Sequence, residues 1–164
     1  MQVVVAFDPG GTTGMTVARK KDPGRRVSGE WTWEFYELGP SQHHAILWRD
    51  LNHLNVLIPK SVDLTVVCES FDHRANEAAE LISCEYIGII VLWCTVKEVR
   101  LVMQTPSEAK NFWTDNKLKH LGLYHPTKGD HSNDATRHAL RFITQWRDKT
   151  FIYQLKGING ASAV

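Results

Sequence analysis

Residues 3–18 read VVVAFDPGGTTGMTVA, an apolar run that ends on Asp8 and is followed by a turn of proline, glycine and threonine. A second apolar run begins at Gly14. This pattern predicts two antiparallel strands, residues 2–8 and 14–20, joined by a tight loop. A carboxylate at the end of a buried strand is costly unless it has a partner. Asp8 therefore either forms local hydrogen bonds in the turn or holds a positive charge.

The rest of the chain predicts a mixed sheet with helices on its faces. One run of alternating aromatic and polar residues and two short apolar runs predict three further strands. Because the last two strands follow helices, the expected sheet is α/β and five-stranded, with three antiparallel strands and two strands reached through helical crossovers. The further strands are expected at 29–38, 63–69 and 98–105, and the helices at 41–57, 75–96, 106–113, 116–120 and 131–148.

Size and composition predict one globular domain. The chain has 164 residues, 43% of them hydrophobic and 23% charged. We expect a domain over residues 1–156 and a flexible tail over 157–164. No secretory signal is recognised, and the apolar residues 86–96 are too few to cross a bilayer, so we expect a cytoplasmic protein without a membrane partner. The three cysteines lie in apolar surroundings and are expected to be reduced, buried thiols: Cys68, Cys84 and Cys94.

The charge of the chain is uneven along its length. Residues 1–96 hold 8 Lys and Arg against 12 Asp and Glu, whereas residues 97–164 hold 11 against 6. A basic C-terminal half is compatible with a phosphate-backbone partner, although such charges usually form a solvated face.

Three acidic residues that are distant in the sequence are expected to meet at one edge of the sheet. Asp8 ends the first strand and Glu69 ends the fourth, so parallel neighbours would place both carboxylates together. In GDHSNDATRHAL, which opens the last helix, Asp134 lies one turn from Asp130 and from His131. Docking of this helix start over the sheet edge would bring Asp134 to the other two acids.

Such a cluster of acids predicts a metal site. Neighbouring carboxylates raise one another's pKa unless a cation compensates their charge, and oxygen ligands around a cleft suit Mg²⁺ or Mn²⁺. Two such ions about 3.5–4 Å apart hold the attacking and leaving oxygens of a phosphoryl displacement. Each acid also has an ordinary explanation: Asp8 as a turn residue, Glu69 as a solvated strand end, and Asp134 as an acid in a first helical turn.

Three segments, FDPGGTTGMTVA, VCESF and HSNDATRHAL, resemble the acidic motifs of the RuvC-like Holliday junction resolvases. These enzymes belong to the RNase H-like nuclease superfamily. The resemblance covers nearly the whole chain with the motifs in the same order, and the size and divergence resemble a bacteriophage member. It implies an RNase H-like fold and a two-metal endonuclease that cleaves Holliday junctions and other branched DNA, such as forks and flaps. For a phage protein, the expected location is the cytoplasm of the bacterial host.

The resemblance matches Asp8, Glu69 and Asp134 with the catalytic acids of the family. His131 stands where many members have an acid and others a histidine. An imidazole there could ligate the second metal, which favours Mn²⁺, or act as a general base on the attacking water. Asp130 is the alternative fourth ligand, and its ordinary explanation is a loop or helix-capping role.

The resemblance also implies contacts with DNA. An aromatic residue soon after the motif glutamate helps to open base pairs in related enzymes, which points to Phe71, with Arg74 as a phosphate contact; a buried phenylalanine is the alternative. Gly14 is explained by hairpin geometry, by close approach of a phosphate, or by both. Four lysines between the fifth strand and the last helix form, as a set, a candidate phosphate-binding surface, although a single lysine of this kind is more often simply solvated: Lys110, Lys117, Lys119 and Lys128.

The family arrangement is a two-fold dimer. It implies a contact near the helix at 75–96, whose apolar residues are equally well explained by core packing.

Two other functions are open at this point. DPGGTTG loosely matches the phosphate loop of actin-type and sugar-kinase-type phosphotransferases, but those enzymes need two such subdomains, and the G-x-x-x-x-G-K-[ST] loop is absent. A non-catalytic module of the same fold that binds branched DNA is the second alternative. His131 in place of an acid keeps it open, while the intact three acids speak against it.

Overall fold

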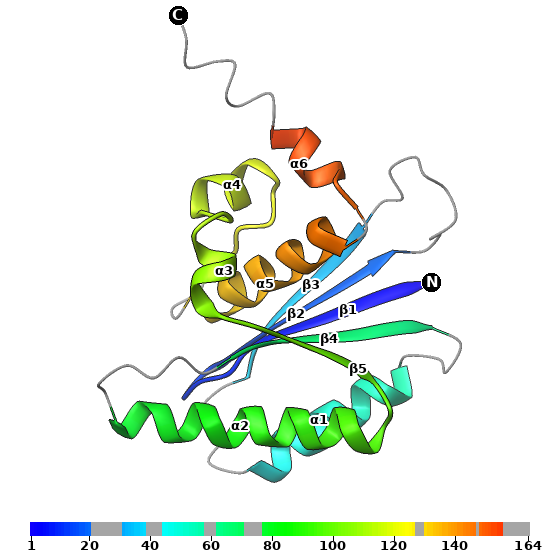
Figure 1. Ribbon diagram of the computed structural model, residues 1–164, viewed down its shortest axis with the longest axis vertical. Coiled ribbons are helices and arrows are strands. Elements are labelled where there is room, and N and C mark those ends of the chain that lie inside the picture. Colours follow the sequence, from blue (N-terminus) through cyan, green and yellow to red (C-terminus); the bar gives the residue numbers. More distant parts are fainter. Residues whose placement is uncertain are drawn as a thin grey trace, which may run out of the picture.

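The computed structural model describes residues 1–20, 31–38, 44–57, 62–70, 77–126, 130–146 and 148–155 (Figure 1). The strands are β1 (Gln2–Asp8), β2 (Thr13–Lys20), β3 (Trp31–Leu38), β4 (Asp63–Glu69) and β5 (Arg100–Gln104). The helices are α1 (His44–Leu57), α2 (Glu77–Val96), α3 (Pro106–Lys110), α4 (Asp115–His120), α5 (His131–Trp146) and α6 (Thr150–Leu155).

The strands form one mixed sheet in the order β3-β2-β1-β4-β5. β1 pairs antiparallel with β2, and β2 pairs antiparallel with β3. β4 lies parallel to β1 on one side and to β5 on the other. The short loop after β1 permits only an antiparallel return, whereas β4 and β5 follow α1 and α2, which are long enough for crossovers. The predicted five-stranded mixed sheet is confirmed.

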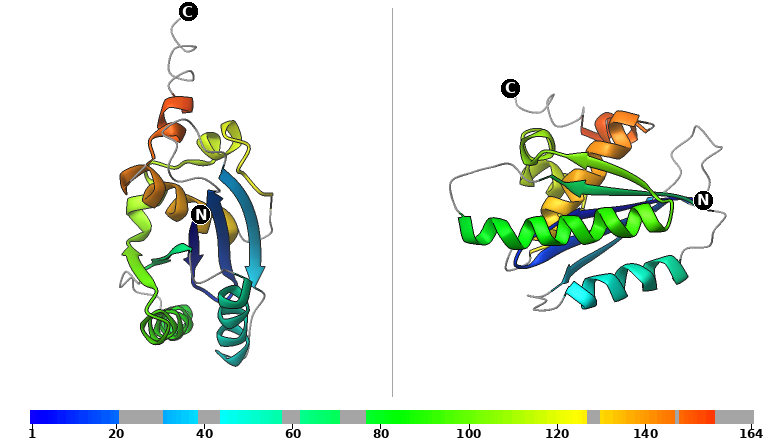
Figure 2. Two further views of the ribbon diagram at one scale, coloured as in Figure 1. Left: turned by 90° about the vertical axis from the view of Figure 1, so that its right-hand side faces the viewer. Right: turned by 60° about the horizontal axis from the view of Figure 1, so that its bottom comes forward.

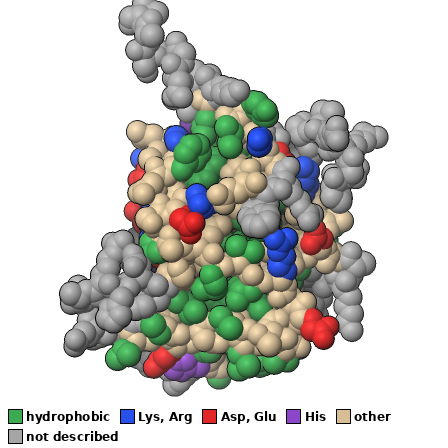
Figure 3. All heavy atoms as spheres, viewed as in Figure 1, with side chains coloured by type: hydrophobic (Ala, Val, Ile, Leu, Met, Phe, Trp, Pro, Cys, Tyr) green, Lys and Arg blue, Asp and Glu red, His purple; other side chains and the backbone are tan. Residues whose placement is uncertain are grey.

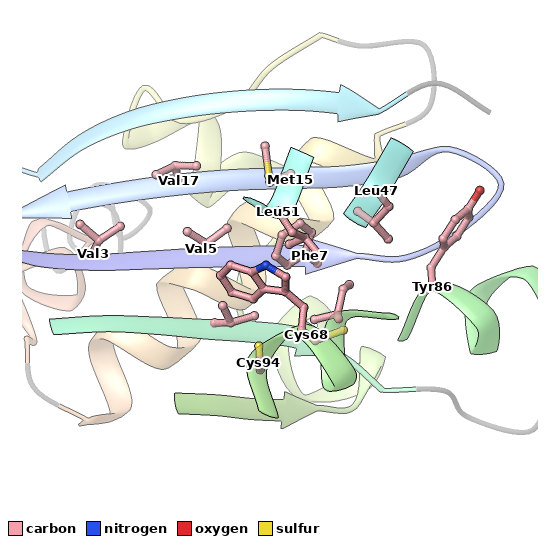
Figure 4. Close-up of a cluster of buried hydrophobic side chains, with 13 residues drawn as sticks. Val3, Val5, Phe7, Met15, Val17, Leu47, Leu51, Cys68, Tyr86 and Cys94 are labelled. Carbon is pink, nitrogen blue, oxygen red and sulfur yellow. The ribbon is translucent and has the colours of Figure 1, made fainter. Parts of the chain in front are cut away.

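Helices cover both faces of the sheet (Figure 2). α1 and α2 lie on one face, and α5 lies on the other with α3, α4 and α6 beyond it. Side chains of β1 alternate between the two layers: Val3, Val5 and Phe7 join the cluster with α1 and α2, and Val4 and Ala6 join the cluster with α5. This double burial explains why β1 is an uninterrupted apolar run. Figure 4 labels further members of the first cluster: Met15, Val17, Leu47, Leu51, Cys68, Tyr86 and Cys94.

Several element ends differ from the sequence prediction by one to three residues. β5 begins at Arg100, two residues later than predicted, because the turn after α2 places Glu98 at a φ of 54°. α3 ends at Lys110 rather than at residue 113, and α5 ends at Trp146, two residues early. Helix ends are the least sharply encoded part of a helix.

One helix was not predicted. α6 follows α5, and its Phe151 and Leu155, four residues apart, pack into the apolar cluster beneath α5. The spacing of these two apolar residues was the sequence feature that could have predicted this helix. The predicted tail, residues 157–164, and the predicted starts of the third strand and of the two long helices before β5 lie outside the described residues.

The cysteines are free thiols, but they are not all buried. Cys68 and Cys94 are buried, and burial raises the pKa of both thiols, that of Cys94 to about 12. Cys84 is exposed, so the expectation that all three are buried is wrong for this residue. It lies in α2. None of the described helices is long and apolar enough to cross a membrane.

The start of α5 packs directly on β2 at Gly14. A Cβ at Gly14 would lie 1.9 Å from the carbonyl oxygen of His131 and 2.7 Å from the amide nitrogen of Ser132. Beside this contact, the Thr16 hydroxyl donates to the Ser132 carbonyl over 3.1 Å and lies 2.8 Å from the Thr136 hydroxyl. Small and hydroxyl-bearing residues thus let the two backbones approach closely. This contact accounts for the glycine, and the predicted phosphate approach stays a prediction.

Gly14→Ala is expected to destabilise the protein by about 1–3 kcal/mol, because the added methyl meets rigid backbone. The melting temperature should fall by several degrees, measured by thermal denaturation. Gly11→Ala is the matched control, because no atom in the described part of the chain lies within 4 Å of its added Cβ. Equal melting temperatures for the two variants would show that α5 does not need a glycine at this contact.

Candidate active site

The ends of β1 and β4 place two acids at one edge of the sheet. In the parallel register Phe7 is paired with Cys68, so the next residues, Asp8 and Glu69, end neighbouring strands at the same edge. Asp8 is buried, with 6% of its surface exposed, and the Glu69 side chain is 14% exposed. The predicted juxtaposition of these two strand ends is confirmed.

α5 and α3 complete this cluster. Asp134 lies in the first turn of α5, and the Lys110 ammonium at the end of α3 lies 2.8 Å from its Oδ2. The same ammonium lies 3.3 Å from Glu69 Oε2. One cation therefore bridges an acid from the sheet and an acid from the helix, which shows that the start of α5 does dock over the sheet edge.

His131 faces the third acid. Its Nδ1 lies 3.0 Å from Asp8 Oδ2, and its side chain is about one third exposed. The neighbouring Gly10 is also close, since a Cβ there would lie 3.9 Å from His131 Cε1. The site thus has two parts, the Asp8–His131 pair and the Glu69–Lys110–Asp134 bridge.

The charge of Asp8 is incompletely compensated. Burial raises the pKa of Asp8 above its ordinary value, and the charges of Glu69 and Asp134 act in the same direction. The hydrogen bond with His131 and the charge of Lys110 lower this pKa, but they do not outweigh burial. An additional cation would favour the ionised carboxylate.

At Glu69 and Lys110, in contrast to Asp8, hydrogen bonds and opposite charges outweigh burial and favour the charged form. Burial acts to raise the pKa of Glu69, but the hydrogen bond and charge of His138 and the ammonium of Lys110 outweigh it, so the pKa lies below its ordinary value. Burial acts to lower the pKa of Lys110, but its contact with Asp134 and the charge of Glu69 outweigh burial. The pKa of Lys110 therefore lies above its ordinary value. Glu69 is therefore ionised and Lys110 charged at neutral pH.

Arg137 connects the cluster to the segment that carries the lysines. Its guanidinium donates to Asp134 Oδ1 and to Asp115 Oδ1, and its Nε donates to the Trp113 carbonyl over 2.8 Å. The side chain is 9% exposed. Arg137 therefore fixes both the orientation of Asp134 and the position of the turn between α3 and α4.

The donor set fits a hard divalent cation. Among the described residues, no group of three His, Cys, Asp or Glu side chains is already arranged around one ion position. Glu69 and Asp134 nevertheless share a cation, the Lys110 ammonium, and the buried carboxylate of Asp8 has a raised pKa. Three carboxylates and an imidazole are ligands that Mg²⁺ and Mn²⁺ accept.

The other predicted site residues lie away from this cluster or outside the described residues. Asp130 is exposed, and its Oδ1 accepts from Asn133 Nδ2 over 2.9 Å, so its role as a fourth ligand stays a prediction. Lys117 lies 3.6 Å from the centroid of the Phe112 ring, and Lys119 lies 4.5 Å from that of Tyr124. Residues that fall outside the described part of the chain are Phe71, Arg74 and Lys128.

Three residues of the site were missed in the sequence. Arg137 and His138 follow Asp134 by three and four positions, so their spacing placed them on the same helix face. Gln104 ends β5 opposite Glu69 in the parallel register. The sequence spacing identified these positions as neighbours of the acids. It did not identify them as part of the site, because polar residues of this kind are also common on solvated faces.

Comparison with known proteins identifies the fold. No protein-family model matches the chain, and no curated protein matches its sequence. Among solved structures, Thermus thermophilus RuvC in complex with Holliday junction substrate superposes with a TM-score of 0.61 at 18% identity, over 88% of this chain and 96% of that chain. A second Thermus thermophilus RuvC structure gives 0.58 at 22% identity, over 87% and 95%. The predicted RNase H-like fold is confirmed as a RuvC-like fold.

The Asp8–His131 pair should make stability depend on pH. The hydrogen bond with Asp8 raises the pKa of His131 above its ordinary value of 6.5, so the protonated ring stabilises the folded state. This contribution is fully present below pH 6.5 and is lost as the pH rises through the raised pKa. Because the ring is partly exposed, we expect less than about 1 kcal/mol.

The measurement is urea denaturation of the wild type and of His131→Gln in metal-free buffer at several pH values from about 5.5 to 8.5. The stability difference between the two proteins should shrink as the pH increases. His53→Gln, at an exposed histidine of α1, is the control and should follow the wild type. A difference that stays constant or grows with pH would contradict the pairing.

Proposed function

We propose that this protein is a metal-dependent endonuclease that cleaves Holliday junctions and other branched DNA. The observation that carries the proposal is the meeting of Asp8, Glu69 and Asp134, from two strands and a helix, at one edge of a RuvC-like sheet. The solved RuvC with Holliday junction substrate supports the choice of DNA, since that complex has the same fold.

Asp8, Glu69 and Asp134, with His131, are the residues that would hold the metal. Bound Mg²⁺ or Mn²⁺, two ions per site, would activate water and stabilise the leaving oxygen of the phosphodiester. The neutral His131 ring offers a nitrogen either as a ligand or as a base for the attacking water. Lys110 holds Glu69 and Asp134 close to each other. Its positive charge also suits a contact with a DNA phosphate.

The surface formed by α3 and α4 supports DNA binding next to these acids. Lys117 and Lys119 each lie against an aromatic ring, and Phe112, the ring beside Lys117, is 43% exposed. Ammonium groups next to aromatic rings, one of them exposed, suit a partner with phosphates and bases. Further DNA contacts proposed from the motif resemblance are Phe71, Arg74, Lys128 and the backbone at Gly14.

α2 supports a two-fold dimer. It exposes a set of apolar side chains away from the core, and Figure 3 shows hydrophobic side chains gathered where α2 runs in Figure 1. Gly88 lies midway along α2, and no atom of the described residues lies within 4 Å of a Cβ added there, so another helix could approach closely. A dimer would place two active sites on one four-way junction. The large apolar side chains described as exposed on α2 are Leu81, Ile82, Val91, Leu92 and Val96.

A bacteriophage origin and a location in the bacterial host belong to the proposed function. A chain of 164 residues with 18–22% identity to bacterial RuvC suits a divergent bacteriophage protein. Its place of action would then be the cytoplasm of the bacterial host, where branched recombination or replication intermediates form.

Asp8→Asn, Glu69→Gln and Asp134→Asn are each expected to reduce cleavage of a synthetic four-way junction more than about a hundredfold, because each removes a charged ligand. Junction binding should remain measurable by gel shift. Cleavage is followed with end-labelled strands in Mg²⁺, in Mn²⁺ and in EDTA, with fork, flap and linear duplex DNA in parallel.

The matched control is Asp63→Asn, which removes an exposed acid at the other end of β4 and should cleave like the wild type. Full activity of any of the three site variants would contradict the metal site. A wild type that binds the junction without cutting it in either metal would instead be a non-catalytic module.

Leu92→Glu is expected to weaken dimerisation at least about tenfold, because it places a charge on the exposed apolar face of α2. Analytical ultracentrifugation over a range of concentrations measures the dissociation constant. Gln154→Glu, at an exposed position of α6, is the control and should leave it unchanged. An unchanged dissociation constant for Leu92→Glu would exclude α2 from the contact, and a monomeric wild type would exclude the dimer.

A further inference from the structure

Glu69 is held by a histidine that has no access to solvent. His138 lies on α5, one turn after Asp134, and none of its surface is exposed. Its Nε2 lies 2.6 Å from Glu69 Oε2, the same oxygen that faces Lys110. The two residues are 69 positions apart in the chain, so this contact exists only in the folded protein.

The other nitrogen of the ring is also occupied. His138 Nδ1 lies 2.9 Å from Gln104 Oε1, and Gln104 is buried at the end of β5. The parallel register pairs Gln104 with Glu69, so the sheet itself places the amide and the carboxylate side by side under the ring. The three side chains form one hydrogen-bonded chain that spans β4, α5 and β5.

The positions of the protons in this chain follow from its donors and acceptors. An ionised Glu69 only accepts hydrogen bonds, so His138 Nε2 must carry a hydrogen. If Gln104 presents its oxygen to Nδ1, the ring is an imidazolium with a hydrogen on both nitrogens. If the amide is rotated by half a turn, its Nε2, which is buried without a partner among the described residues, donates to a neutral ring. In both cases the Nε2–H of His138 points at Glu69.

The fixed ring limits the freedom of Glu69. Surface glutamates sample many rotamers, whereas Glu69 Oε2 accepts from a ring that is itself locked by core packing and by Gln104. Asp134 is held differently, by Arg137, whose guanidinium also supports the backbone of Trp113. Among the described residues, the hydrogen-bond partners of the His138 ring are side chains, so replacing the ring removes no backbone hydrogen bond described at the site.

We propose that His138 is a positioning residue that, together with Gln104, fixes the Glu69 carboxylate in the orientation in which it binds a divalent cation. The inference rests on the proposed function, because it assumes a metal at Glu69. His138 donates a hydrogen bond to a ligand and touches neither the metal nor DNA. Residues that orient a metal ligand in this way change metal affinity by about 10–100-fold when they are replaced.

The test compares His138→Leu, which keeps volume but removes the donor, with His138→Gln, whose side-chain amide can reach the position of Nε2. Mn²⁺ affinity is measured without DNA by electron paramagnetic resonance of the free ion, and melting temperatures are measured alongside. His138→Leu should lose about 10–100-fold in Mn²⁺ affinity and His138→Gln should recover most of it. On a four-way junction, kcat should fall with affinity while KM stays within about twofold, because no DNA contact changes.

If the wild type binds Mn²⁺ and cleaves, and His138→Leu binds Mn²⁺ with the same affinity, the inference is overturned and the proposed function stays intact. A wild type without Mn²⁺ binding would overturn both. If the Leu variant does not fold, nitrogen-15 spectra of the wild-type imidazole decide. A slowly exchanging proton on Nε2 that shifts with Mg²⁺ is expected, and a ring protonated only on Nδ1 would refute the inference.

Discussion

The structure depends on a carboxylate at the end of a strand that is buried on both faces. Removing an ionised carboxylate from water is strongly unfavourable unless positive charge or hydrogen bonds replace the solvent. At Asp8 this replacement comes from His131 and, at longer range, from Lys110, and it remains incomplete. The elements that bring these groups, α5 and α3, are therefore tied to the sheet edge by charge as well as by apolar packing. The same incompleteness suits the edge for a divalent cation.

α5 is the element through which the site is organised. Its apolar side packs on the sheet, and its first two turns supply an acid, His131, Arg137 and His138 within eight residues. The close approach at Gly14 sets how far this helix start reaches over the edge. Each acid has its own neighbour: an imidazole for Asp8, a buried imidazole for Glu69, and a guanidinium for Asp134, with one ammonium between the last two. A small displacement of α5 would change all of these contacts together.

The helices on the two faces of the sheet present different surfaces. On one face, α5 and α3 add Asp134 and Lys110 to the two acids at the strand ends, and α4 carries further lysines. On the opposite face, α2 exposes apolar side chains around Gly88. One sheet thus separates a surface with clustered charges from a surface with exposed apolar side chains. Each surface is supported by its own apolar cluster, and β1 contributes side chains to both clusters.

Local patterns in the sequence predicted every strand and every described helix except α6, with their order and the strand directions, because apolar periodicity, turn residues and connection lengths act over a few positions. They also placed Asp8 and Glu69 at the carboxyl ends of two strands that are parallel neighbours, so both residues were expected at the same edge of the sheet. Tertiary structure alone decided which partner each charge received. Lys110 was one of four similar lysines, and nothing local distinguished the one that bridges two acids; nothing local indicated that His138 would be buried against Glu69 or that Cys84 would face outward. The reason is physical: the partner of a buried polar group is set by the packing of distant segments, and the strength of each contact depends on the water that this packing excludes.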